Sequence, residues 1–223
     1  MEKKKNAKDI KLICFDVDDT LVGGSSWQII TEGLGCSRER AVFIYEKAKR
    51  GEISFREAEK DFVKMWKESG NANKKFIRKI ADERKIRAGA EELVSCLKKK
   101  RYLMYLISGS IDILIESVAE KLKFDGFYAN SHFEFDEKGI LSKIFYRENQ
   151  GKIKLEQLNE LSKKIGIAME EIIFVGDSEN DIDVFKTTGK GIIVPGFDGK
   201  FNEELRKVSW KQASSLSKIH QFI

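Results

Sequence analysis

Short apolar runs alternate with stretches of helical periodicity along most of this chain. Uninterrupted apolar residues occupy positions 12–15, 102–107, 172–175 and 192–194. Such runs, bounded by polar residues, are typical of strands buried on both faces of a parallel sheet. Between them, apolar residues recur at intervals of three and four, for example at Leu155, Leu158, Leu161 and Ile165. Strands and helices in this alternation predict an α/β fold with a doubly wound parallel sheet.

The stretch from residue 23 to residue 85 interrupts this alternation because it carries helical signals alone. N-cap and capping-box patterns for three helices follow one another: Ser25 or Ser26, then Ser37, then Ser54 with Glu57. A fourth, shorter helix follows them before the strands resume. We therefore expect a small helical cap at 23–85, inserted between the two segments of a catalytic core, 8–22 and 86–223.

Three local expectations concern the surroundings of a possible site. The second cap helix is expected to point Val42, Tyr45 and Ala48 inward, because they share one helical face. The strand at 102–107 is expected to end at Ser108-Gly109-Ser110, which would open the next helix. Asp136-Glu137-Lys138-Gly139 predicts the turn of a β-hairpin within 133–145.

Composition narrows the class of protein. The 223 residues, 41% hydrophobic and 35% charged, suit one domain with a small inserted module. The net charge of +5 is small, and the basic clusters Lys3–Lys5 and Lys98–Arg101 are short, which fits a solvated tail and a helix end rather than a nucleic-acid surface. We see neither a signal peptide nor an apolar run near the ~20 residues of a membrane span, so we expect no membrane partner and a cytoplasmic location.

The richest stretch of the chain is Leu12 to Leu21, where three carboxylates follow an apolar run. In open α/β sheets the functional site lies at the carboxyl ends of the strands. Asp16 and Asp18 are two residues apart, so in extended chain they would point the same way. Crowded carboxylates repel one another unless a cation or a proton lies between them. The stretch taken alone would also fit a polar strand end.

Two further strand ends carry polar clusters, Ser108-Gly109-Ser110 and Gly176 to Asp181. Asp16 and Asp177 could bind Mg²⁺, which prefers one or two carboxylates together with a substrate phosphate. Hydroxyl and backbone N–H groups at Ser108 to Ser110 could hold phosphoryl oxygens. A lysine, Lys154 or Lys152, would add a positive charge. An aspartate nucleophile could then accept the phosphoryl group and split hydrolysis into two steps.

These clusters, in this order, resemble those of the haloacid dehalogenase superfamily of phosphatases, in its phosphoserine-phosphatase-like branch. Asp16-Val17-Asp18-Asp19-Thr20 matches the DxDxT motif, and Ser108 matches the second motif. Gly176-Asp177-Ser178-Glu179-Asn180-Asp181 matches the GDxxND motif. Lys154, 23 residues before Asp177, is preferred over Lys152 as the motif lysine. The resemblance covers nearly the whole chain.

The resemblance implies a role for each matching residue. Asp16 would be the nucleophile and a Mg²⁺ ligand. Asp18 would donate a proton to the leaving oxygen, later activate water, and bind the metal through its backbone carbonyl. Thr20 would orient the loop, and Ser108, Gly109 and Lys154 would bind the phosphate. Asp177 would bind the metal, and Asn180 and Asp181 would support it.

Two cap positions depart from the pattern of phosphoserine phosphatases. Ser25 stands where that branch carries a glutamate for the substrate ammonium, and Phe62 stands where it carries an arginine for the carboxylate. An amino-acid ligand would thus lose both charged partners unless Glu32, Arg56 or Lys60 replaced them. Trp27 and Phe62 hint at a more apolar leaving group.

The sequence therefore predicts a Mg²⁺-dependent phosphatase that hydrolyses a small phosphomonoester through an aspartyl-phosphate. One alternative is transfer of the phosphoryl group to an acceptor alcohol, since the cap decides whether water is admitted. The other is a phosphate-ligand-binding protein without turnover. The identity of the phosphomonoester and the oligomeric state stay open.

Overall fold

A seven-stranded sheet in the order β4-β3-β2-β1-β5-β6-β7 forms the centre of the molecule. The structure is a computed structural model that describes residues 10–223. All strand pairs are parallel except β3 with β4. The strands are β1 (Leu12–Phe15), β2 (Leu103–Ile111), β3 (Gly126–Phe135), β4 (Leu141–Tyr146), β5 (Ile172–Gly176), β6 (Gly191–Ile193) and β7 (Lys211–Gln212). The predicted α/β fold with a doubly wound sheet is confirmed. Residues 8 and 9 of the predicted core and the cluster Lys3–Lys5 lie outside the described residues.

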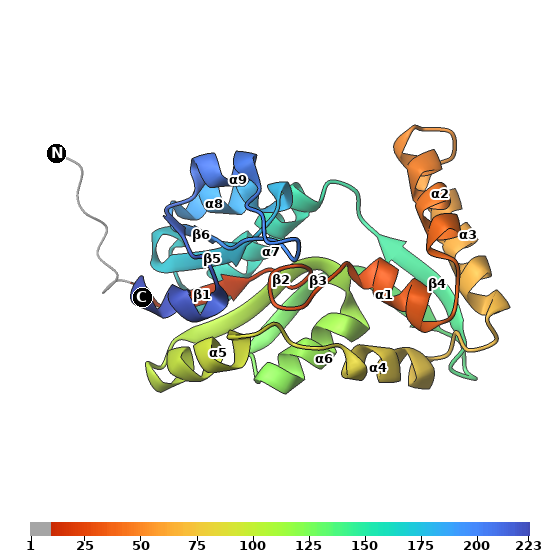
Figure 1. Cartoon of the computed structure of the whole chain (residues 1–223), viewed down its shortest axis with the longest axis horizontal. Helices are drawn as coiled ribbons and strands as arrows, with labels where there is room; N and C mark the ends of the chain where they lie inside the picture. Colours follow the sequence, from red (N-terminus) through yellow and green to blue (C-terminus); the bar gives the residue numbers. More distant parts are fainter. Residues whose placement is uncertain (1–9) are drawn as a thin grey trace.

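Helices cover both faces of the sheet (Figure 1). One face packs against α5 (Ala90–Lys99), α6 (Asp112–Leu122) and η4 (Leu216–Gln221), and the other against α7 (Gln150–Ile165), α8 (Ile182–Thr188) and α9 (Glu203–Val208). The residues of β1 are all apolar because the strand is buried on both faces of the sheet. Ile13 and Phe15 enter the first core, whereas Leu12 and Cys14 enter the second, because successive side chains of a strand point to opposite faces.

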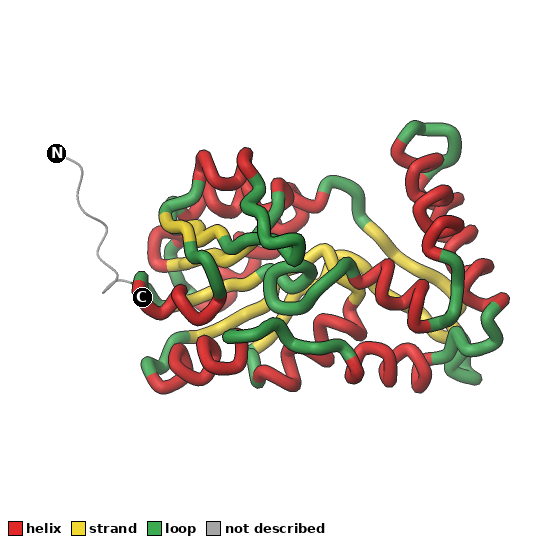
Figure 2. The backbone as a smooth tube through the Cα atoms, viewed as in Figure 1, coloured by secondary structure: helices red, strands yellow, loops and turns green. Residues whose placement is uncertain are grey.

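The cap region consists of α1 (Ser26–Gly33), α2 (Arg38–Lys49), α3 (Phe55–Glu68) and α4 (Lys74–Glu83). Its first three helices begin at the predicted N-caps, with Ser25, Ser37 and the Ser54–Glu57 capping box in place. α2 and α3 stand apart from the helices of the sheet (Figure 2). They share a third apolar core with β3 and β4 and the start of α6. The division at 22/23 and 85/86 stays a prediction.

Two local expectations are wrong. Strand β2 continues through Ser108 to Ile111, and α6 begins only at Asp112. The reason is tertiary: Ile111 pairs with Ser131 of β3 after a register shift, and this pairing extends the strand. In α2, Ala48 is buried as expected, but Val42 and Tyr45 are 51% and 48% exposed, because this face of the helix borders an open cavity. The predicted hairpin turn is confirmed, since Asp136 to Gly139 connects β3 and β4.

Candidate active site

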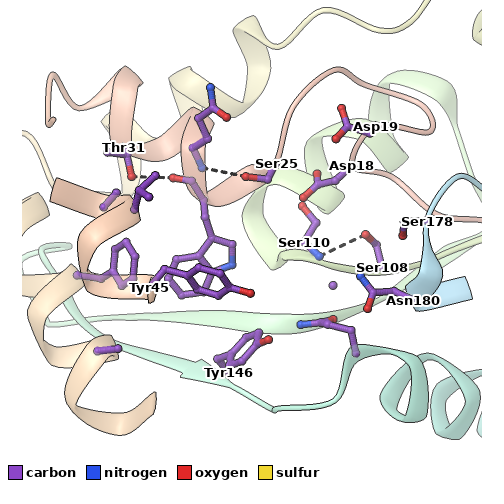
Figure 3. A pocket seen from close by; sticks show the side chains of 18 of the residues that line it. Asp18, Asp19, Ser25, Thr31, Tyr45, Ser108, Ser110, Tyr146, Ser178 and Asn180 are labelled. Carbon is purple, nitrogen blue, oxygen red and sulfur yellow. Dashed lines mark hydrogen bonds between the residues drawn. The ribbon is translucent and has the colours of Figure 1, made fainter. Parts of the chain in front are cut away.

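The polar clusters predicted from the sequence meet at one end of the sheet. Asp16 follows β1, Asp177 follows the neighbouring β5, and Ser108 belongs to β2 on the other side of β1. They border a cavity of about 470 Å³ between the sheet and the cap helices. Figure 3 shows Ser108, Ser178 and Asn180 at one end of this cavity and Tyr45 and Tyr146 towards the other.

A buried lysine joins two of the acids. The ammonium of Lys154 lies 3.0 Å from Asp16 Oδ2 and donates to Asp181 Oδ1 at 2.6 Å. Burial alone would lower the pKa of Lys154, but the negative charges of Asp16 and Asp181 outweigh it and hold that pKa above its ordinary value. Lys152, the other candidate, is exposed and does not line the cavity. The structure therefore places Lys154 beside Asp16 as a fixed positive charge.

Three buried carboxylates converge at the floor of the cavity. Asp16, Asp177 and Asp181 each offer an oxygen, and these oxygens lie within 4.8 Å of one another. Burial raises the pKa of Asp16 to about 6, against the opposing charge of Lys154, and burial together with the charge of Asp16 raises the pKa of Asp177 to about 8. The carboxylates thus repel one another in a site with little water.

The carboxylate oxygens at this site are suitable ligands for a divalent cation. Oδ1 of Asp16 is buried and has no hydrogen-bond partner among residues 10–223. Within the part of the chain that the structure describes, the Asp177 carboxylate accepts a hydrogen bond only from the Thr20 hydroxyl, at 2.5 Å on Oδ1. Asp181, by contrast, has both oxygens engaged, by Lys154 and by the N–H groups of Asp177 and Ser178. Asp16 and Asp177 are therefore the residues with free oxygens for a cation such as Mg²⁺.

The carboxylate of Asp18 bonds to residues outside the carboxylate cluster. Its Oδ1 accepts from Arg84 Nη1 at 3.0 Å, and its Oδ2 accepts from the Ser26 N–H at 2.8 Å. Arg84, whose side chain is 3% exposed, also donates to the carbonyls of Gly23 and Gly24 in the segment that leads into α1. Asp18 is thus tied to the start of the cap rather than to the carboxylate cluster.

The phosphate-binding residues expected from the sequence form one wall of the cavity. Ser108 is buried, accepts the Ser110 N–H at 3.2 Å, and lowers the pKa of Asp16 by hydrogen bonding to it. Gly109 leaves room for the Gln150 side chain, because a Cβ at position 109 would lie 2.3 Å from Gln150 Oε1. Asn180 also lines the cavity. The backbone here is extended, so no helix N-terminus is involved.

The two cap positions that depart from the family pattern both border the cavity. Ser25 caps α1 by accepting the Gln28 N–H, and Phe62 is buried on α3. The three charged residues considered as replacements, Glu32, Arg56 and Lys60, are exposed and do not line the cavity.

Sequence reasoning missed three residues of the site: Arg84, Tyr146 and Gln150. Arg84 follows α4 in a polar stretch without a motif, and its partner Asp18 is 66 residues earlier. Tyr146 is the last residue of β4 and Gln150 is the first residue of α7. Both line the cavity because of where the sheet places these two elements. The one signal available for Tyr146 and Gln150 was that they precede Lys154 by a few residues.

Comparison with known proteins places this arrangement in a family. Residues 13–186 match the haloacid dehalogenase-like hydrolase family. The chain belongs to this family. The matched residues include Asp16, Ser108, Lys154 and Asp177, which line one cavity in the structure.

Relatives in sequence and structure agree with this membership. The chain is 33% identical to phosphoserine phosphatase from Methanocaldococcus jannaschii over 85% of both chains, and 29% identical to that from Streptococcus thermophilus over 81% of this chain and 82% of the relative. A solved substrate-bound phosphoserine phosphatase complex superimposes over both whole chains with a TM-score of 0.72 and 26% identity. The predicted branch and enzyme class, a phosphoric monoester hydrolase, are confirmed.

Proposed function

We propose that this chain hydrolyses the phosphomonoester of a small metabolite, with Asp16 as the nucleophile and Mg²⁺ as the cofactor. One observation carries the proposal: a buried aspartate with a free oxygen lies beside a buried lysine, a second carboxylate with one free oxygen, and a serine hydroxyl. The solved phospho-aspartyl intermediate analogue of a phosphoserine phosphatase, 26% identical with a TM-score of 0.71, supports an aspartyl-phosphate route.

In the first step, a carboxylate oxygen of Asp16 attacks phosphorus and the bond to the leaving oxygen breaks. The phosphoryl group is then covalently attached to Asp16, and the alcohol leaves with a proton from Asp18. Lys154 and Ser108 are placed to stabilise negative charge on the phosphoryl oxygens. Mg²⁺ bound by Asp16 and Asp177 would neutralise charge at this end of the cavity.

In the second step, water attacks the phosphorus of the aspartyl-phosphate and gives a proton to Asp18. The bond between phosphorus and Asp16 breaks, which releases inorganic phosphate and restores both carboxyl groups. We expect the ion pair between Asp18 and Arg84 to open when Asp18 carries a proton, because the pair depends on the charge of the carboxylate. The linker that Arg84 also contacts leads into the cap, so we infer that movement of the cap accompanies this opening.

Neither alternative is favoured by the comparisons or by the residues present. The named relatives are phosphatases, and all the acids that the motifs require are in place. No helix among the described residues is both long and apolar enough to cross a bilayer. The cytoplasmic location stays a prediction.

A phosphatase assay tests the proposal. Purified protein with Mg²⁺ should release phosphate from p-nitrophenyl phosphate, and a chelator or the substitution Asp16→Asn should abolish release. The proposal would be contradicted if the folded protein hydrolysed no member of a broad panel of phosphate esters with any divalent cation.

A further inference from the structure

The cap side of the cavity is lined by helix faces that are mostly apolar. In α3 the lining residues are Phe55, Ala58, Glu59 and Phe62, and in α2 they include Ala41, Val42, Tyr45 and Ala48. Both sets follow helical spacing, so one continuous face of each helix borders the cavity. Val42 and Tyr45 remain about half exposed there, which leaves an apolar surface for a ligand to cover.

Aromatic rings from three elements form part of the cavity wall. Trp27 of α1 packs against Phe62 of α3 at 5.0 Å between ring centroids, and it meets Tyr146 of β4 at 6.0 Å and 88°. Phe55 lies 6.0 Å from Tyr146. All four rings also line the cavity. An aromatic ligand would add edge-to-face or offset contacts to such a set.

Trp66 shows how an aromatic residue that serves packing alone differs from these. Its side chain is fully buried in the cap core, and its indole N–H donates to Thr31 Oγ1 at 3.1 Å. It does not line the cavity. Trp27, in contrast, is only partly buried and does line it.

Two charged residues on the cap side border the cavity, but neither stands at the family positions, which are Ser25 and Phe62 here. Glu59 borders the cavity, but its Oε1 already accepts the Tyr146 N–H at 2.9 Å. Arg38 is exposed at the first residue of α2 and borders a second, outer pocket as well. A zwitterionic leaving group would place its charges against Ser25 and Phe62, where burial without a partner is costly.

We propose that the alcohol released by this enzyme is uncharged and carries an aromatic ring, which binds against Trp27, Tyr45, Phe62 and Tyr146. The inference rests on the phosphatase function proposed above. It concerns only the leaving group, because the phosphoryl end is held by Asp16, Ser108 and Lys154 in either case.

The test compares esters of aliphatic alcohols, so that differences in leaving-group reactivity stay small. We expect kcat/KM for benzyl phosphate to exceed that for phosphoserine, choline phosphate and glycerol phosphate by about tenfold or more, the range that apolar pockets achieve. Equal or better turnover of phosphoserine or choline phosphate would overturn the inference while leaving the phosphatase function intact.

A matched pair of variants on α2 locates the effect. Tyr45 borders the cavity, whereas Phe43 is 58% exposed and borders only the outer pocket. Tyr45→Ala should raise KM for benzyl phosphate several-fold and leave glycerol phosphate unchanged, and Phe43→Ala should alter neither. Equal effects of both variants, or an equal loss on both substrates, would contradict the inference.

A binding measurement separates this inference from the proposed function. Calorimetry on the Asp16→Asn variant with Mg²⁺ should show tighter binding of benzyl phosphate than of phosphoserine, whether or not the natural chain turns either over. If no phosphate ester is hydrolysed but this preference holds, the proposed function fails, and what stands is a surface that binds an uncharged aromatic group. If phosphoserine binds as tightly, the inference fails.

Discussion

The guanidinium of Arg84 lies 3.0 Å from the carboxylate of Asp18, and the two residues are 66 positions apart. Arg84 also bonds the carbonyls of Gly23 and Gly24, so one side chain connects the catalytic loop, the entry to the cap and the exit from α4. Breaking a buried ion pair at one partner leaves the other without compensation.

The Asp18 side chain is 21% exposed, so Arg84→Gln leaves a charge that water can reach, and we expect it to lower the free energy of unfolding by about 1.5–3 kcal/mol, the range for hydrogen bonds to charged groups. Urea denaturation measures this loss, and a double-mutant cycle with Asp18→Asn isolates the pair. A coupling free energy within about 0.5 kcal/mol of zero would mean that the two side chains act independently.

Lys154 and Lys152 form a natural comparison, because they lie two residues apart but only Lys154 reaches the carboxylates. Lys154→Met should reduce kcat/KM by about 10²-fold or more, as loss of one charge-stabilising donor does elsewhere. Lys152→Met should leave it unchanged. Steady-state kinetics with one substrate decides this, and the reverse order would move the catalytic lysine to position 152.

Metal binding should be detectable without turnover. Because Asp16 and Asp177 have free oxygens in a buried acidic cluster, Mg²⁺ should raise the melting temperature of the protein, and a chelator should reverse the rise. Asp177→Asn should remove most of the Mg²⁺ effect. An exposed acid outside the cluster gives the control: Glu204→Gln should respond to Mg²⁺ as the natural chain does. A shift that survives Asp177→Asn would place the ion elsewhere.

Gly109 lies against the end of a flexible side chain, and its backbone is not in the left-handed region. A Cβ at this position would lie 2.3 Å from Gln150 Oε1, so Gly109→Ala should displace the Gln150 side chain and disturb the phosphate wall. We expect a loss of about tenfold or more in kcat/KM, as small displacements near reacting groups cause. The double variant Gly109→Ala/Gln150→Ala should recover part of that loss. No recovery would show that Gly109 acts through another contact.

Much of the fold was predictable because its signals are local. Ser25, Ser37 and Ser54 cap helices through bonds to N–H groups three residues later, which the sequence displays directly. The end of β2 was not predictable, because its extension to Ile111 depends on pairing with Ser131. The end of a strand depends on how far it pairs with its neighbour, and that pairing is not visible in the strand itself.

The candidate site divides in the same way. Asp16, Ser108, Lys154 and Asp177 follow motifs, and the structure brings them to one cavity. Arg84 and Tyr146 come from distant segments, and only the folded topology shows that they meet Asp18 and Trp27. The exposure of Tyr45 could not be foreseen either, because helical periodicity does not distinguish a cavity wall from a packed core.

The central claim is that Asp16 carries the phosphoryl group. Digestion with pepsin in acid, where an acyl phosphate survives, should release a peptide that contains Asp16, Asp18 and Asp19. Acid quenching during turnover with Mg²⁺, followed by mass spectrometry, should find one phosphoryl group on this peptide, and fragmentation should place it on Asp16. A phosphoryl group on another residue, or turnover with an unmodified peptide throughout, would contradict the account.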